Sequence, residues 1–179
     1  MLASKLVVGG LSLLLVGQIG FMVYRSARQR DWVRRINAAS RELRISDVRS
    51  SGEGSLRGAI LASGSCVLVV AVDPTCAVCQ RMRSTWSRRF YKWEALTQHQ
   101  VRPIWLSIAD SASSLAFFAG HELSGITQAY VAGAPALAAR QLELIATPTS
   151  YMFGSGARLR GRIVGDFLPA VDSVRRWCS

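Results

Sequence analysis

The feature that most constrains the fold is an apolar run that leads into a pair of cysteines. Residues 66–73 read Cys-Val-Leu-Val-Val-Ala-Val-Asp. A continuous β-branched run of this kind is typical of a strand buried on both faces of a sheet. Pro74 and Thr75 end the run, and residues 77–99 then carry apolar side chains three or four apart, which predicts a helix. A buried strand followed by a helix favours the α/β class, in which helices cover both faces of a sheet.

The rest of the chain continues the alternation of strands and helices. Further strands are expected at residues 101–109, 126–131, 149–153 and 158–164. Further helices are expected at residues 31–46, 110–122, 134–144 and 168–177. Asp110 is expected to cap a helix rather than to act as a catalytic acid. The Ser-Ser-Gly-Glu-Gly-Ser segment at 50–55 is expected to be a linker or turn.

A separate segment near the amino terminus resembles a membrane anchor. Residues 6–24 form an uncharged run of 19 residues, close to the roughly 20 that span a bilayer as a helix. A cleaved signal peptide is the alternative, but its apolar region is only ~7–15 residues long and ends at a small-x-small site. The run here is longer and leaves through Tyr24-Arg25. We therefore expect an uncleaved, single-pass transmembrane anchor at residues 1–25.

The charge of the chain is strongly positive, with 22 basic and 11 acidic residues and a net charge of +11. The excess begins directly after the uncharged run, in a set of arginines that we call the basic collar. The collar consists of Arg25, Arg28, Arg30, Arg34 and Arg35. Basic residues beside a membrane span are attracted to anionic lipid headgroups. Because no nucleic-acid recognition motif follows, we expect a lipid surface and no nucleic-acid partner.

The two cysteines that follow the buried strand predict redox chemistry. Cys76 falls where the strand passes into the helix, so its sulfur lies at the helix amino terminus, where free N–H groups and the dipole stabilise a thiolate. Cys79 comes one turn later and faces back toward Cys76. This spacing suits thiol–disulfide exchange, in which Cys76 forms a mixed disulfide and Cys79 resolves it.

At this point the sequence resembles the thioredoxin superfamily, and in particular its membrane-anchored thiol–disulfide proteins of the TlpA type. The strand, Cys-x-x-Cys, the Ala146-Thr-Pro-Thr149 segment and the glycine-turn hairpin occur in the family's order over about residues 55–179. The Pro-Thr-Cys-x-x-Cys form is most similar to the methylamine-dehydrogenase maturation (MauD-like) accessory type, whose family role is to assist a disulfide-rich extracytoplasmic subunit. The resemblance implies a thioredoxin-like domain at 55–179, joined to the anchor by a basic helix and linker at 26–54.

The resemblance also implies roles for individual residues. Cys76 and Cys79 are the expected catalytic pair, and Thr147-Pro148 matches the family's cis-proline loop, which together with Thr75 is expected to bind substrate. One departure is notable: the family's buried acid, which helps to deprotonate the second cysteine, falls at Val70 and is missing. Reductase, oxidase and isomerase roles therefore stay open.

Two alternatives remain at this level. The domain is expected to exchange disulfides with an extracytoplasmic protein client at a bacterial cell membrane, although the basic collar, by the positive-inside rule, argues for a cytoplasmic domain. The first alternative is a non-catalytic accessory subunit of a membrane complex. The second is metal delivery through the cysteine pair with His99 or His121, but no diagnostic ligand spacing is present, so no metal or other cofactor is expected. Cys66 is expected to be a buried thiol and Cys178 a free one.

Overall fold

The computed structural model describes residues 2–48, 52–64, 66–97, 100–119 and 126–179, with side chains described from residue 16 onward. The chain divides into two compact units, Met1–Arg35 and Ile36–Ser179. Helix α1 (Leu2–Glu42) forms the first unit and contributes its last turns to the second. All other elements belong to the second unit, which we call the folded domain.

The predicted membrane-spanning run at residues 6–24 lies in α1. The side chains of residues 1–15 fall outside the described part of the chain, whereas those of Val16, Ile19, Phe21 and Val23 are exposed. Among the residues that the structure describes, no helix combines the length and the apolar character that a membrane crossing needs. The anchor at 1–25 therefore stays a prediction.

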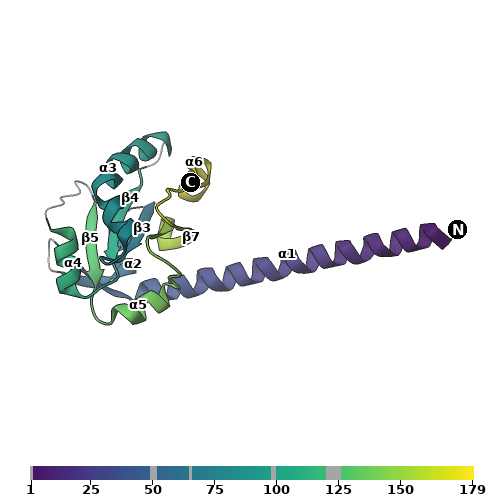
Figure 1. The fold of residues 1–179 in the computed structure, drawn as a ribbon, viewed down its shortest axis with the longest axis horizontal. Helices are drawn as coiled ribbons and strands as arrows, with labels where there is room; N and C mark the ends of the chain where they lie inside the picture. Colours follow the sequence, from purple (N-terminus) through teal and green to yellow (C-terminus); the bar gives the residue numbers. More distant parts are fainter. Residues whose placement is uncertain (1, 49–51, 65, 98–99, 120–125) are drawn as a thin grey trace. The chain divides into compact units, whose positions relative to one another are not determined.

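A mixed sheet forms the centre of the folded domain (Figure 1). The strands, in spatial order, are β2 (Glu53–Ser55), β1 (Arg44–Asp47), β5 (Thr127–Val131), β4 (Arg102–Ser107), β3 (Val67–Val72), β6 (Thr149–Gly154) and β7 (Arg158–Val164). The central strands β3, β4 and β5 are parallel, and the remaining pairings are antiparallel. As the β-branched run predicts, every residue of β3 is buried.

Helix α3 (Ala77–Thr97) covers one face of this sheet. Its apolar stripe packs on alternate residues of β3 in one buried cluster, which includes Leu68, Val70, Val72, Met82, Trp86, Phe90 and Trp93. The Trp86 ring stacks on Phe90 at 4.8 Å between centroids and meets Trp105 of β4 edge-on at 5.3 Å. Aromatic pairs of this kind add packing energy beyond the area they bury, so α3 is held firmly along its length.

The carboxyl-terminal helix α6 (Val171–Cys178) packs beside α3 over the same cluster (Figure 1). The Trp93 indole N–H donates to the Pro169 carbonyl at 2.7 Å, just before α6. The ring of Trp177 lies against β7 at Gly161, where a Cβ atom would come within 2.5 Å of the ring. Only glycine leaves room for that ring.

Other helices complete the layers. Helix α2 (Leu56–Ser63) follows β2 and buries Leu56 and Ile60, while α4 (Ser111–Phe118) follows β4 and α5 (Pro135–Gln141) follows β5. Asp110 caps α4 as expected, because its carboxylate accepts from the Ser113 N–H at 2.8 Å. A single 3₁₀ turn, η1 (Ser155–Ala157), joins β6 to β7 in the predicted hairpin.

The segment before the buried strand differs from the expectation. The predicted helix over 31–46 ends at Glu42, and residues 44–47 form β1 instead. Part of the expected linker at 50–55 is strand β2, and α2 was not anticipated. The sequence Arg-Ile-Ser-Asp carries a single apolar residue, so it shows no alternation of apolar and polar residues that would predict strand β1. It becomes a strand because its backbone pairs with β5, far along the chain.

Candidate active site at the amino terminus of α3

A tight turn between β3 and α3 presents the first cysteine. The Asp73 carboxylate accepts both the backbone N–H and the hydroxyl of Thr75 through Oδ1, at 2.8 Å each. The Asp73 carbonyl accepts the N–H of Cys76 at 3.0 Å. Thr75, which the sequence assigns to substrate binding, is exposed here and uses its hydroxyl to hold the turn. Cys76 is thereby placed directly before the first residue of α3.

Cys76 occupies the capping position of the helix. Its Sγ accepts the backbone N–H of Cys79 at 3.3 Å, and its carbonyl accepts the N–H of Gln80 at 3.0 Å in the first helical hydrogen bond. Cys76 is partly exposed, whereas Cys79 is fully buried, and both are free thiols. The structure thus brings the two predicted cysteines together, with only the first open to a substrate.

The loop before β6 forms the other side of the site. The Thr147–Pro148 peptide bond is cis. The Cys76 thiol donates to the Thr147 carbonyl at 3.2 Å, although 71 positions separate the two residues. The Pro148 carbonyl in turn accepts the N–H of Gly165 at 2.8 Å, which joins this loop to the end of β7. A substrate sulfur bonded to Cys76 therefore meets the backbone of Thr147.

The electrostatic environment favours the thiolate of Cys76. Partial burial by itself raises the pKa of this thiol, but hydrogen bonds from the Cys79 thiol, the Cys79 amide and the Thr147 side chain outweigh it, so that the pKa lies below its ordinary value. The amino terminus of α3 points its free N–H groups at the same sulfur. Because a nucleophilic thiol needs a lowered pKa, Cys76 is the candidate nucleophile of the pair.

Cys79 has the opposite character. Burial, together with the hydrogen bond that it donates to Cys76, raises the pKa of Cys79 to about 12. Val70, where the resemblance implies a buried acid, is 1 % exposed and packs in the same apolar cluster as Cys79. No carboxylate of the described residues stands there to accept its proton. Cys79 is therefore a thiol at neutral pH.

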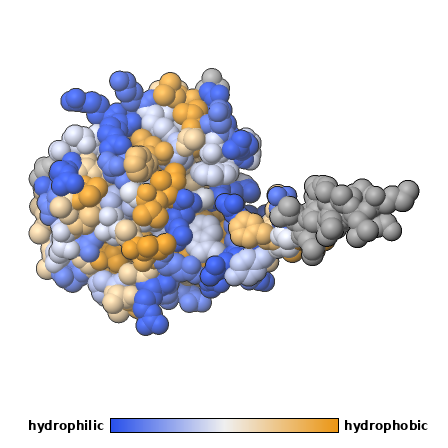
Figure 2. Space-filling view, turned by 45° about the vertical axis from the view of Figure 1, so that its right-hand side comes forward, coloured by the Kyte–Doolittle hydropathy of each residue, from blue (hydrophilic) through white to orange (hydrophobic). Residues whose placement is uncertain are grey.

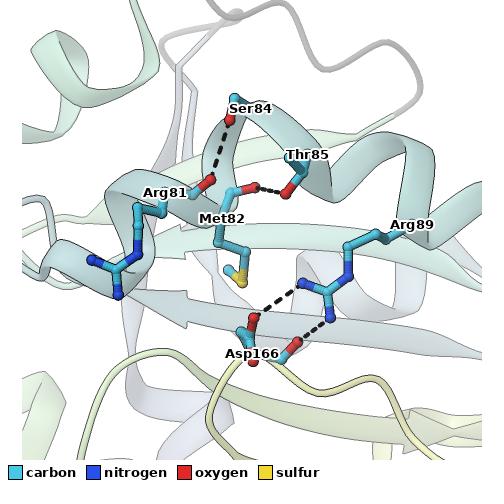
Figure 3. A network of polar contacts seen from close by, with 6 residues as sticks. All are labelled: Arg81, Met82, Ser84, Thr85, Arg89 and Asp166. Carbon is cyan, nitrogen blue, oxygen red and sulfur yellow. Dashed lines mark hydrogen bonds and ion pairs between the residues drawn. The ribbon is translucent and has the colours of Figure 1, made fainter.

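An arginine on α3 ties the helix to the loop beside the cis-proline (Figure 3). The Arg89 guanidinium donates to the Asp166 carboxylate at 3.1 Å and to the Asp166 carbonyl at 2.8 Å. Asp166 follows Gly165, whose N–H holds Pro148. Two hydrogen bonds thus join α3, which carries the cysteines, to the loop after β7, and the Gly165 N–H joins that loop to the cis-proline. The sequence does not reveal this contact, because Arg89 and Asp166 are 77 positions apart along the chain.

The other two cysteines are bonded to each other, which differs from what the sequence predicts. Cys66, expected as a buried thiol, and Cys178, expected as a free one, form a disulfide with their Cα atoms 5.4 Å apart. It joins the residue before β3 to the end of α6 across 112 positions. Spacing in the sequence carries no signal for such a pair, since only the packing of α6 over the core brings the two together.

The metal hypothesis finds no candidate ligand set. Within the part of the chain that the structure describes, no group of three or more His, Cys, Asp or Glu side chains is arranged to hold an ion. His99 and His121, the histidines considered from the sequence, both lie outside the described residues.

Solved structures show that this architecture has relatives. A secreted Mycobacterium tuberculosis disulfide oxidoreductase, homologous to Escherichia coli DsbE, matches with a TM-score of 0.51 and 14% identity, over 80% of this chain and 95% of its own. DsbF from the same species matches with a TM-score of 0.52 and 12% identity, over 77% of this chain and 93% of its own. The thioredoxin domain of a Bacteroides vulgatus thiol-disulfide oxidoreductase matches with a TM-score of 0.52 and 12% identity, over 75% and 88%.

These likenesses define the class of fold. The chain has a mixed α/β, thioredoxin-like fold, as the resemblance in the sequence implies. Two of these solved proteins, the secreted one from M. tuberculosis and the one from B. vulgatus, are described as disulfide or thiol-disulfide oxidoreductases, and what the likeness shows of this chain is its fold. Neither a family model nor a curated protein sequence gives a significant match to the chain.

Proposed function

We propose that this protein is a membrane-anchored thiol–disulfide oxidoreductase that exchanges disulfides with an extracytoplasmic protein client through Cys76 and Cys79. The observation that carries the proposal is the placement of the Cys76 thiol. It caps α3, its pKa is lowered, and it lies 3.2 Å from the carbonyl of Thr147 in the cis-proline loop. Thr147 and Pro148 then bind the client backbone, and Thr75 supports the turn beside them.

In the reducing direction the proposed reaction has two steps. The Cys76 thiolate attacks one sulfur of a client disulfide, forms a mixed disulfide, and releases the other client sulfur as a thiolate. Cys79 then loses its proton and attacks Sγ of Cys76, which releases the client as a dithiol and leaves a Cys76–Cys79 disulfide. Burial is the main cause of the raised pKa of Cys79, and formation of the mixed disulfide removes the smaller contributions that come from Cys76. The oxidising direction is the same sequence reversed.

The stabilised thiolate bears on the direction of electron flow. Hydrogen bonds that lower the pKa of Cys76 stabilise the thiolate of the reduced protein, but they do not stabilise its disulfide form. Such a pair is easier to reduce than one whose nucleophile has an ordinary pKa.

Two observations support an anchored, extracytoplasmic domain. The uncharged run at 6–24 is long enough to span a bilayer, and its described apolar side chains, Val16 to Val23, are exposed in α1. The Cys66–Cys178 pair is a disulfide outside the reactive pair, and such disulfides persist in oxidising compartments. We propose that the basic collar then lies against anionic lipid headgroups. Maturation of a disulfide-rich redox protein, the MauD-like role, is one client relationship this arrangement suits.

The experiment that tests the chemistry uses the full chain in detergent, reduced only at Cys76 and Cys79. We expect Cys76→Ser to abolish exchange with a peptide disulfide and Cys79→Ser to accumulate the mixed disulfide, seen by mass spectrometry. Ser84→Ala is the matched control, because Ser84 lies on the same helix and its hydroxyl donates only to the nearby Arg81 carbonyl (Figure 3). Wild-type protein that leaves the peptide disulfide intact contradicts the proposal.

The accessory-subunit alternative has a distinct signature in cells. If the protein acts only as a scaffold, a variant with both Cys76 and Cys79 replaced by serine keeps full function and co-purifies with its complex in fixed stoichiometry. Loss of function in that variant, with its membrane level unchanged, supports the redox role.

The side of the membrane on which the folded domain lies is tested by labelling the Cys76 sulfur. Cys76 is partly exposed, so a membrane-impermeant alkylating reagent added to intact spheroplasts labels it if the folded domain lies outside the cytoplasm. Labelling only after lysis contradicts that location and agrees with the orientation favoured by the basic collar.

A further inference from the structure

The solvent face of α3 carries a row of positive charges that the site described above does not use. The helix contains five basic residues and a single acidic one, Glu94. Arg81, Arg88 and Lys92 are exposed, and we call these three residues the basic stripe. Since an α-helix turns by about 100° per residue, Arg88 and Lys92 lie within roughly 20° of Arg81 around the helix axis. Hydrophilic side chains project from the top of the domain in Figure 2, where Figure 1 places α3.

The other two arginines of α3 are engaged within the fold. Arg83 donates to the Phe117 carbonyl, and Arg89 is paired with Asp166. By contrast, no carboxylate in the described part of the chain forms an ion pair with a member of the basic stripe. The Arg81 guanidinium extends from the helix without a partner among the residues drawn in Figure 3. The stripe is therefore free to meet a charged group from another molecule.

The basic stripe begins close to the reactive sulfur. Arg81 follows Cys76 by five positions on the same helix. At a rise of 1.5 Å per residue, Arg81 lies about 7.5 Å from Cys76 along the helix axis, and Lys92 lies about 24 Å from it. An extended chain covers these distances with about two to seven residues, at about 3.3 Å per residue. A client joined to Cys76 can thus lay the residues that flank its own cysteine along the stripe.

A row of unpaired cations favours an anionic partner, because complementary charge speeds encounter and fixes orientation. A protein client with acidic residues and an anionic lipid surface both have this chemistry. The position of the stripe favours the client, since the stripe lies on the helix that carries both cysteines and the client is the molecule that must reach Cys76. The proposed lipid contact already has the basic collar of α1.

We propose that the basic stripe binds an acidic segment of the client, whose glutamate or aspartate side chains lie about two to seven residues from the cysteine that bonds to Cys76. The proposal rests on the proposed function and names the substrate class of the same site. The stripe raises the rate at which clients with acidic residues beside their disulfide reach the reactive sulfur. Because its side chains are exposed, its attraction for carboxylates falls as the salt concentration rises.

The test compares peptides that differ only in charge. Each peptide has one cysteine joined to thionitrobenzoate, and its flanking segment, on one side or the other, carries glutamate, glutamine or lysine. The Cys76 thiolate attacks the peptide sulfur and the coloured thionitrobenzoate anion leaves. Cys79 then loses its proton, attacks Sγ of Cys76 and releases the peptide thiolate. The second-order rate of colour release is recorded for the reduced full chain in a nonionic detergent.

Salt and charge reversal separate the stripe from other effects. At about 0.01 M salt we expect the glutamate peptide to react roughly tenfold faster than the glutamine peptide for one of the two placements, and the lysine peptide to be the slowest. At about 1 M salt the glutamate-to-glutamine ratio falls close to one. Arg81→Glu together with Arg88→Glu brings the ratio to one or below at low salt. The ratio cancels any effect of the new charges on the reactivity of Cys76 itself.

The matched control is Arg102→Glu together with Arg158→Glu, which changes the net charge of the chain by the same amount. Both arginines are exposed, and they begin β4 and β7 at the end of the sheet away from Cys76. This control pair is expected to keep most of the preference for glutamate. If the stripe variant loses its near-ultraviolet circular dichroism, Arg81→Gln together with Arg88→Gln replaces it and is expected to lower the ratio by a smaller factor.

The other outcomes contradict the proposal or the function beneath it. Equal rates for the glutamate and glutamine peptides overturn the proposal and leave the proposed function standing. A preference that survives in the stripe variant, or that the control pair loses equally, comes from other charges of the chain and also overturns it. A preference that disappears when phosphatidylglycerol is added to the micelles assigns the stripe to an anionic lipid surface instead. Failure of the wild-type protein to react with any peptide, whatever its charge, refutes the proposed function itself.

Discussion

Loss of the Cys66–Cys178 disulfide is expected to destabilise the folded domain severely. The bond closes a segment of 112 positions, and it holds α6 to the start of the central strand. In the chain-entropy model a loop of 112 residues stabilises the native state by about 4.8 kcal/mol at 25 °C. That is a large fraction of the ~5–15 kcal/mol that a domain has in total.

The measurement is urea unfolding, followed by tryptophan fluorescence, with and without dithiothreitol. Trp86 and Trp105 are at most 2 % exposed and report on the core. The background carries Cys76→Ser and Cys79→Ser, so that the reductant changes only this disulfide. With a slope of ~2 kcal/mol per molar urea, the midpoint is expected to fall by roughly 2 M. Cys178→Ala is the matched variant: Cys178 is partly buried, and the variant's curve is expected to overlie that of the reduced protein.

Three results refute this reasoning. Coincident unfolding curves with and without reductant show that the disulfide does not restrain the unfolded chain. Recovery of Cys66 and Cys178 as separately alkylated peptides, without prior reduction, shows that the bond does not form. If dithiothreitol still lowers the urea midpoint of the Cys178→Ala variant, the loss of stability comes from a group other than this disulfide.

Four further outcomes follow from the site and the packing. Thr147→Val removes a hydrogen bond to the thiolate and is expected to raise the pKa of Cys76, measured as an upward shift in the pH profile of alkylation. The pKa of Cys79 is raised to about 12 from an ordinary 9.0, so above pH 9.0 the thiol ionises in the unfolded chain before it does in the folded one. The free energy of unfolding of the reduced protein is therefore expected to fall as the pH rises above 9.0. In the Cys79→Ala variant this dependence of the unfolding free energy on pH is expected to be weaker. Arg89→Ala breaks an ion pair whose side chains are about two-fifths exposed, and is expected to cost no more than ~1 kcal/mol of unfolding free energy, less in high salt. Gly161→Ala places a methyl group 2.5 Å from the Trp177 ring and is expected to cost ~1–3 kcal/mol, seen in the thermal midpoint.

The core of the fold was predictable because its signals are local. The β-branched run at 66–73 became the fully buried β3, and the apolar period after it became α3. The glycine turn of the hairpin and the aspartate cap of α4 were also recognisable, since each depends on residues within a few positions of one another. The cysteine pair belongs with these, because its spacing and its place at a helix start are both visible in the sequence.

The edge of the sheet was not predictable in the same way. Strand β1 carries too few apolar residues for a period, and it exists because its backbone completes hydrogen bonds with β5. The partner of Cys66 was hidden for a related reason, since 112 positions separate it from Cys178. In both cases the information lies in contacts between distant segments.

The sequence by itself thus determined which residues are the candidates for the chemistry: Cys76, a second cysteine one turn later, and a proline loop that matches the pattern of the family it resembles. The tertiary structure alone decided their environment. It brought Thr147 from 71 positions away to 3.2 Å from the Cys76 sulfur and buried Cys79 beside Val70. A pKa depends on what surrounds a group, and only the folded chain provides those surroundings.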